Sequence, residues 1–176
     1  MAQHCFTTAN QLRQMCDDNN VRWISYIDLE SCSASLALGV PADEVIIHPD
    51  AETGSIGCCV SLMDTSIAMN KMGLKQIYIT SAPGKIPFNA DGSFTEKFLA
   101  DIQDRVDMCG VDFATHVAEY TGIPFAAVKE MDAKIFSAQE ALQVGLVNKI
   151  MDHQQFAAYL AASQTGACNV GQMAKN

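Results

Sequence analysis

The pattern of apolar and polar residues near the start of the chain switches between helical and strand-like spacing. In Thr8–Asn19, apolar residues recur on one face of a helix, with Thr8 as the capping residue. Val21–Ile27 and Val45–His48 are short runs rich in β-branched and aromatic residues, as is typical of buried strands. The small and apolar residues of Ser31–Val40 suit a buried helix. The pattern therefore predicts helix, strand, helix and strand in that order.

The next segment combines turn signals with one further helix and strand. Two glycines in Thr53–Val60 indicate a tight turn or a close backbone approach. A helix over Ser61–Met72 and a strand over Gln76–Thr80 follow. Ser81–Gly92 is crowded with turn-forming residues, so we expect a loop there.

A long helical pattern begins after this loop. Ser93 and Glu96 have the spacing of a capping box, and apolar residues recur at helical intervals up to a stop at Gly122. We expect one long helix with a bend near Gly110. Pro124 can open a further helix, because proline is favoured at the first helical positions.

The C-terminal part shows a second capping box and a last strand. Ser137 and Glu140 form the box, Leu146–Ile150 is typical of a strand, and a helix is predicted over His153–Ala162. We find no repeat and no interdomain linker, so we expect one domain over residues 1–162 and a flexible tail over 163–176. Strands that alternate with helices predict an α/β fold whose parallel strands are joined by helical crossovers.

The composition limits the function. Of 176 residues, 49% are hydrophobic and only 18% are charged, which favours a sizeable core and faces buried against partner subunits. Eleven Lys and Arg stand against 20 Asp and Glu, for a net charge of −9. Such a chain cannot neutralise a phosphate backbone over an extended surface, so nucleic acid is not an expected partner.

Neither a membrane span nor a metal site is expected. The longest apolar run is far shorter than the roughly 20 residues that cross a bilayer, and the first residues lack a signal-peptide pattern. We therefore expect a cytoplasmic protein. The seven cysteines follow no paired spacing and indicate reduced, buried thiols. The four histidines have no metal-ligand spacing, and we expect no cofactor.

Three stretches resemble peptidase family S49 of the ClpP/crotonase superfamily, which includes bacterial signal peptide peptidase A and phage prohead proteases. CSASLALGVPADEVIIHPDAETGSIG at Cys32–Gly57 resembles the family's nucleophile helix, the strand after it and its TGSIG turn. ITSAPGKIPF at Ile79–Phe88 is similar to the segment that carries the family's lysine. Val117–Met151 resembles the family's C-terminal pattern. The resemblance runs from about Ile24 to Met151 and looks nearer to the prohead branch.

The resemblance implies a catalytic dyad, with Ser33 as nucleophile and Lys85 as general base. Ser55, the serine of TGSIG, would orient Lys85 through a hydrogen bond. A serine hydroxyl is a poor nucleophile until a base takes its proton, and a neutral lysine amine can do so when desolvation lowers its pKa. Moving a lysine pKa from about 10.4 to about 7 requires roughly 4–5 kcal/mol, which a buried site can impose.

One departure from the family pattern concerns the oxyanion hole. In the family, a strand and a Pro-Gly-Gly loop precede the segment that corresponds to Thr8–Asn19, and a glycine N–H of that loop helps to form the hole. This sequence contains no Gly-Gly pair. We therefore expect a ClpP/crotonase-like layered fold that lacks its first strands, with an exposed sheet edge that a separate chain could cover. Loss of one oxyanion donor typically lowers the rate by about 10² to 10³.

The function implied by the resemblance is a serine endopeptidase that forms an acyl-enzyme. Its substrates would be flexible protein or peptide segments, such as phage capsid or scaffold proteins in the host bacterium's cytoplasm, and it would form a homo-oligomer. One alternative is a weakly active or inactive fragment that serves as an assembly subunit. An acyl-CoA enzyme is disfavoured by the TGSIG and lysine segments. A Ser-His-Asp site that uses His48 or His116 stays open, because triads are defined by geometry.

Overall fold

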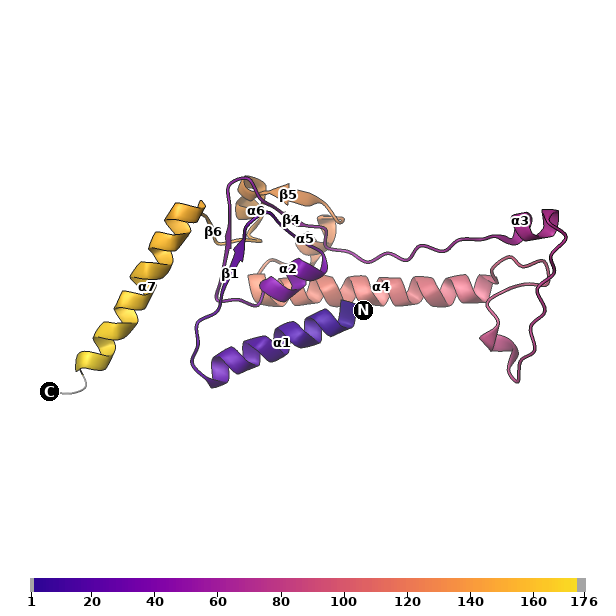
Figure 1. Ribbon diagram of the computed structural model, residues 1–176, viewed down its shortest axis with the longest axis horizontal. Helices are drawn as coiled ribbons and strands as arrows, with labels where there is room; N and C mark the ends of the chain where they lie inside the picture. Colours follow the sequence, from indigo (N-terminus) through magenta and orange to yellow (C-terminus); the bar gives the residue numbers. More distant parts are fainter. Residues whose placement is uncertain (1, 174–176) are drawn as a thin grey trace. The chain divides into compact units, whose positions relative to one another are not determined.

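The structure is a computed structural model that describes the backbone of residues 2–173 and the side chains of residues 4–163. Its helices and strands follow one another along the chain as Figure 1 shows. They are α1 (Ala2–Asp18), β1 (Ile24–Ile27), β2 (Glu30–Cys32), α2 (Ala34–Gly39), β3 (Glu44–Ile47), β4 (Glu52–Gly54), α3 (Ser66–Lys71), η1 (Pro83–Lys85), α4 (Glu96–Thr121), α5 (Phe125–Glu130), β5 (Ile135–Ser137), α6 (Ala138–Val144), β6 (Lys149–Ile150) and α7 (His153–Met173).

The chain divides into two compact units. The first comprises the residues up to Gly57 and those from Asp112 onward, and the second comprises Cys58–Val111. The single domain over residues 1–162 stays a prediction. The backbone of α7 continues past Ala162 to Met173, while the side chains of residues 164–176, where most of the predicted tail lies, are outside the described residues.

The first unit contains two three-stranded sheets. In one sheet the order is β1-β3-β6, with both pairs parallel. In the other the order is β2-β4-β5, where β2 and β4 are parallel and β5 is antiparallel to β4. The connection from β1 to β3 passes through β2 and α2, so parallel strands are joined by a crossover that includes a helix. The predicted α/β class is confirmed.

The core of the first unit surrounds α2. Leu36 and Ala37 of this helix are fully buried, together with Phe113 and Val117 of α4. Helix α1 packs on α2, and its Phe6 ring lies 5.4 Å from the ring of Phe113. Full burial of each large apolar side chain stabilises the fold by roughly 1.5–3 kcal/mol. These contacts hold α2 between α1 and the C-terminal half of α4.

Several local signals act as the sequence predicts. The Ser137 side chain accepts a hydrogen bond from the Glu140 N–H, and the Glu140 carboxylate accepts one from the Ser137 N–H, which is the predicted capping box. Helix α4 is one continuous helix that ends just before Gly122, whose φ of 74° stops it. Helix α5 follows Pro124 directly.

Other boundaries differ from the predictions. Helix α1 begins before Thr8, which is therefore no cap, and the residues predicted as a helix from Ser31 start instead with β2. Helix α4 is capped by Thr95, whose Oγ1 accepts a hydrogen bond from the Phe98 N–H at 3.2 Å. The Ser93 hydroxyl donates to Asp91 at 2.6 Å, so the predicted box of Ser93 and Glu96 is wrong.

The second unit lacks the predicted strand at Gln76–Thr80. These residues have no regular structure, and Ile79 is 99% exposed. A strand needs a neighbour for its hydrogen bonds, and none within the described chain pairs with this segment. The helix α3 is also shorter than the predicted Ser61–Met72. A row of stacked rings organises this unit instead, formed by Tyr78, Phe88, Phe94 and Phe98.

The six cysteines whose side chains the structure describes are less buried than predicted. No disulfide joins the six cysteines whose side chains are described. Five of them are half-buried and Cys59 is exposed, so none is fully buried.

Candidate active site

Ser33 occupies a strained turn between a strand and a helix. Strand β2 ends at Cys32 and α2 begins at Ala34, which leaves Ser33 alone at the turn. Its φ of 54° and ψ of −121° match the first central position of a type II′ turn, which glycine normally occupies. Strain of this kind amounts to about 1–3 kcal/mol and is concentrated at functional sites. Sharp strand-to-helix turns are also how α/β-hydrolases expose their nucleophilic serine.

The backbone around Ser33 is held on both sides of the turn. The Ser33 N–H donates to the Gly54 carbonyl at 2.9 Å, and the parallel register of β2 and β4 pairs Cys32 with Gly54. The fully buried Thr53 donates its hydroxyl to the Ser31 carbonyl at 2.6 Å. A strained conformation persists only where its surroundings determine it, and these hydrogen bonds supply that constraint.

The TGSIG turn lies beside Ser33 and requires its glycine. Gly54 has φ 125°, and a Cβ there would lie 2.4 Å from the Lys134 carbonyl oxygen. The Ser55 N–H donates to the same oxygen at 2.9 Å, and Ser55 has φ 53°. The predicted close backbone approach is therefore present at Gly54, against the segment that leads into β5.

The structure brings Ser33 and Ser55 to the same sheet edge. Each directly follows one member of the Cys32–Gly54 pair, at the carboxyl ends of two parallel strands. Ligand sites of open α/β sheets lie at such carboxyl ends. Both serines are half-buried, so their hydroxyls lie at the boundary between the core and solvent.

One backbone group at this site was not predicted from the sequence. Ala34 is the first residue of α2, and an N–H at this position has no carbonyl partner within its helix. In strand-to-helix turns of this kind, the N–H of the residue after the nucleophile points at the oxyanion. A backbone N–H is present in every residue except proline, so residue type does not reveal this donor. The small residues that follow Ser33 were the one sign in the sequence that a helix begins there.

Cys32, next to Ser33, has a thiol whose surroundings favour the protonated form. Burial, together with the charge of Glu30, raises the pKa of the Cys32 thiol. A protonated thiol is a weak nucleophile, so this environment disfavours attack by Cys32.

A groove runs along the polypeptide that leads into the turn. It has a volume of about 610 Å³ and is lined by β1, the residues between β1 and β2, and parts of α1 and α2. Ser31 and Ser35, on either side of Ser33, line it, and their hydroxyls are 3.0 Å apart. Ser33 itself is not one of the residues that line this groove.

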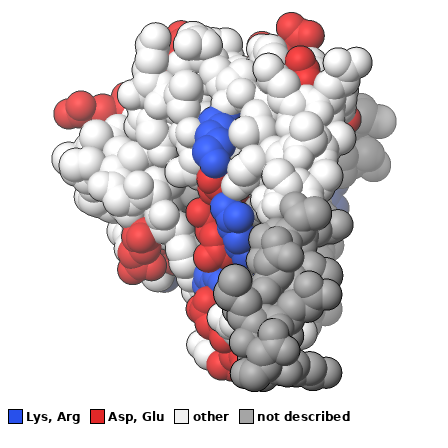
Figure 2. Space-filling model, turned by 90° about the vertical axis from the view of Figure 1, so that its left-hand side faces the viewer, with Lys and Arg blue, Asp and Glu red and all other residues white. Residues whose placement is uncertain are grey.

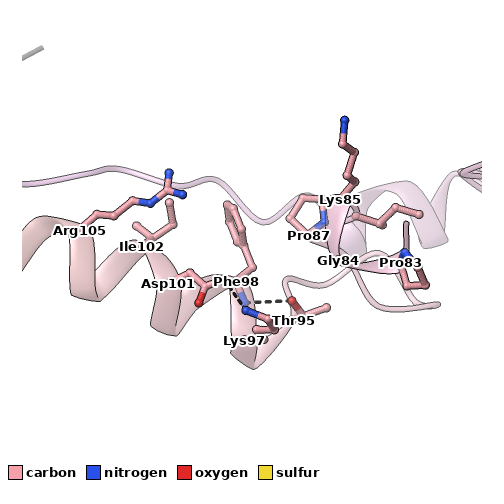
Figure 3. A pocket seen from close by; sticks show the side chains of 11 residues that line it. Pro83, Gly84, Lys85, Pro87, Thr95, Lys97, Phe98, Asp101, Ile102 and Arg105 are labelled. Carbon is pink, nitrogen blue, oxygen red and sulfur yellow. Dashed lines mark hydrogen bonds and ion pairs between the residues drawn. The ribbon is translucent and has the colours of Figure 1, made fainter. Parts of the chain in front are cut away.

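Lys85 lies in the second unit, whereas Ser33 and Ser55 lie in the first. It ends the short turn η1, where its N–H donates to the Ala82 carbonyl at 3.0 Å. Its side chain is exposed, and Lys85 helps to line a cavity of about 380 Å³. Lys97 and Asp101, which form an ion pair, line the same cavity, and the Lys85 side chain points away from them (Figure 3). The pairing of Ser33 with Lys85 stays a prediction.

The positions of two histidines bear on the alternative of a triad with Ser33. His116 is buried in α4, and its Nε2 lies 2.8 Å from the Ala37 carbonyl oxygen. His48 contacts the ring of His153 at 4.6 Å and lies near Asp50. Within residues 4–163, no hydrogen bond joins Ser33 to a histidine, and no cluster of His, Cys, Asp and Glu has the arrangement of a metal site.

Charged groups of both signs are mixed on the surface. On the face in Figure 2, basic and acidic side chains follow one another in a narrow band between broad uncharged areas. Nucleic-acid binding requires an extended positive surface, which this face does not offer. Across residues 2–173, no helix combines the length and apolar character needed to cross a membrane.

Comparison with known proteins yields a family match over most of the chain. The model of "Peptidase family S49" matches residues 17–166. The chain is 29% identical to "Capsid assembly protease C" of Escherichia phage lambda over 122 residues, which cover 69% of this chain and 28% of that protein. It is 24% identical to "Head-tail preconnector protein GP5" of Enterobacteria phage P21 over 143 residues, which cover 81% of this chain and 28% of that protein.

Each match spans little more than a quarter of these curated relatives. Among solved structures, an enoyl-CoA hydratase/isomerase family protein from Silicibacter pomeroyi superposes with a TM-score of 0.46 at 17% identity, over 88% of this chain and 47% of that one.

Proposed function

Because the chain belongs to peptidase family S49, we propose that it is a serine peptidase with Ser33 as nucleophile and Lys85 as general base. The observation that carries the proposal is the backbone of Ser33. A serine held at φ 54° and ψ −121°, between a strand and a helix, occupies the conformation that exposes a nucleophile. The family match reaches from before Ser33 to beyond Lys85 and so includes both members of the dyad.

The proposed reaction proceeds through an acyl-enzyme. Lys85, as general base, takes the Ser33 proton while the hydroxyl oxygen attacks the carbonyl carbon of the peptide bond. The Ala34 N–H donates to the oxyanion of the tetrahedral intermediate. Lys85 then gives the proton to the leaving amine, the C–N bond breaks, and water releases the acyl group by the reverse sequence. Ser55, at the same sheet edge, orients the Lys85 amine through its hydroxyl.

A second oxyanion donor would come from residues outside this sequence. The chain has no Gly-Gly pair to supply it, so we expect the chain alone to act about 10² to 10³ times more slowly than a complete site. A polypeptide that carries a Pro-Gly-Gly segment and pairs with an open sheet edge would complete the hole. If such a polypeptide restores no activity, the alternative function as an assembly subunit is favoured.

The proposed substrates are flexible segments of phage capsid or scaffold proteins. The basis is the similarity to proteins named for capsid assembly and for the head-tail preconnector. The chain would act in the cytoplasm of the host bacterium and would self-associate. Exposed apolar side chains in the second unit, such as Met63 at 81% and Ile79 at 99%, favour such association.

Covalent labelling tests the proposal directly. A fluorophosphonate probe reacts with activated serines, so mass spectrometry should find the adduct at Ser33 in the wild type and in His48→Ala. The label should be absent in Ser33→Ala and strongly slowed in Lys85→Ala. Hydrolysis of an unfolded casein substrate should fall by similar factors in both single variants, and scarcely further in the double variant, because dyad members act as a unit. Labelling that persists in Ser33→Ala, or that depends on His48, contradicts the dyad.

A further inference from the structure

Helix α2 contains a carbonyl that its own backbone cannot satisfy. In an α-helix, the carbonyl of residue 37 would accept a hydrogen bond from the N–H of residue 41. Residue 41 is proline, which has no N–H. Ala37 is 0% exposed, so water does not reach this carbonyl either. The Leu36 and Gly39 carbonyls, by contrast, accept bonds from Val40 and Ala42.

His116 of α4 supplies the missing donor. Its Nε2 lies 2.8 Å from the Ala37 oxygen, and because a carbonyl only accepts, this nitrogen carries the proton. The ring is 4% exposed and lies between Phe6 of α1, at 5.1 Å, and Tyr120, at 5.0 Å. Burial lowers the pKa of His116, which keeps the ring neutral, with one nitrogen free of a proton.

The bond from His116 is the first in a series that reaches the candidate nucleophile. The Ala37 N–H donates to the Ser33 carbonyl at 3.1 Å, and the Ser33 N–H donates to the Gly54 carbonyl at 2.9 Å. Three hydrogen bonds thus connect α4, the first turn of α2, the strained residue and the TGSIG turn. Ser33 and Ala37 are therefore each hydrogen-bonded through both their N–H and their C=O groups.

We propose that His116 is a positioning residue. Its Nε2–H holds the Ala37 carbonyl and thereby fixes the first turn of α2, and this turn keeps Ser33 and Ala34 in reactive geometry. The inference rests on the proposed function. It assigns to His116 a role different from that of a triad base, because the imidazole contacts a backbone carbonyl and not the Ser33 hydroxyl. A shift of about 1 Å in a reacting group can lower a rate by about 100-fold, which is the effect expected when the bond is lost.

The surroundings of His116 explain why a neutral donor suffices. On α4, Glu119 raises the pKa of His116, but less than burial lowers it, and Tyr120 is the other titratable neighbour. From α1, the ring contacts the apolar Phe6, and from α2 it contacts the Ala37 carbonyl. Arg13 and Asp17 of α1 act on Tyr120. A glutamine amide, neutral at every pH, can therefore replace the Nε2–H donor.

The test compares His116→Met, which removes the donor, with His116→Gln, which keeps one. Fluorophosphonate labelling of Ser33 should slow by about 10- to 100-fold in His116→Met and return to within about threefold of the wild-type rate in His116→Gln. Val117→Ala is the matched control, because Val117 is fully buried on the same helix and contributes only packing there. This control should lower the melting temperature without slowing the labelling of the folded protein.

A second readout is independent of activity. ¹⁵N NMR of histidine-labelled wild type should show His116 as the neutral Nε2–H tautomer at pH 8, well above the ordinary histidine pKa. A charged ring or an Nδ1–H tautomer overturns the inference, and so does equal labelling of His116→Met and wild type. If the tautomer is as expected but wild-type Ser33 takes no label, the proposed function fails and the positioning role fails with it. Labelled wild type with an unaffected His116→Met refutes the inference alone.

Discussion

Replacing Ser33 by glycine should leave the protein more stable than replacing it by alanine. Both variants lose the hydroxyl, but alanine keeps a Cβ at φ 54° and ψ −121°, where glycine is unstrained. The strain amounts to about 1–3 kcal/mol. Glycine loses roughly 0.5–1 kcal/mol more backbone entropy on folding, so a net difference of about 1 kcal/mol should favour Ser33→Gly.

Urea unfolding measures this difference. Trp23, the only tryptophan, belongs to the first unit and reports its unfolding by fluorescence. With a slope of about 2 kcal/mol per molar urea, the midpoint of Ser33→Gly should lie about 0.5 M above that of Ser33→Ala. Both variants should be inactive.

The same pair of substitutions at Ser35 is the control. Ser35 lies inside α2, where glycine is less favourable than alanine by about 1 kcal/mol, so the order of the two midpoints should reverse. If Ser33→Gly unfolds at or below the midpoint of Ser33→Ala, the Ser33 backbone is not strained. The conformation of Ser33 would then no longer support its role as the nucleophile.

Three other properties can be measured. Gly54→Ala should destabilise the first unit by about 3 kcal/mol or more, because its Cβ would meet a backbone oxygen at 2.4 Å, whereas Gly110→Ala, in an open helical position, should not destabilise the protein. The Lys134 ammonium and the Ser137 N–H lower the pKa of Glu140 to about 2, so its stabilisation is present above about pH 4.5 and is lost as the pH falls toward 2; acid titration of Glu140→Gln should lack this loss. Light scattering at micromolar concentration should give a multiple of 19.0 kDa, and a monomer alone would contradict self-association.

The sequence alone was sufficient where a structural feature depends on residues close together in the chain. The capping box of Ser137 and Glu140 needs only residues three apart, and the end of α4 needs only Gly122 after a helical pattern. The two glycines of Thr53–Val60 indicated a turn or a close backbone approach, and the structure shows that approach at Gly54. Such features follow from local backbone preferences, which do not depend on the rest of the fold.

Residues far apart in the chain required the tertiary structure. The segment at Gln76–Thr80 has β propensity, but a strand exists only where another strand provides hydrogen bonds, and propensity cannot supply a neighbour. The catalytic assignment of Ser33 came from resemblance, whereas its strained backbone follows from the pairing of Cys32 with Gly54, 22 residues along the chain. The contact of His116 with Ala37 spans 79 residues. Only the packing of α4 on α2 brings this donor to the carbonyl that Pro41 leaves without one, because hydrogen bonding depends on distance in space and not on separation in sequence.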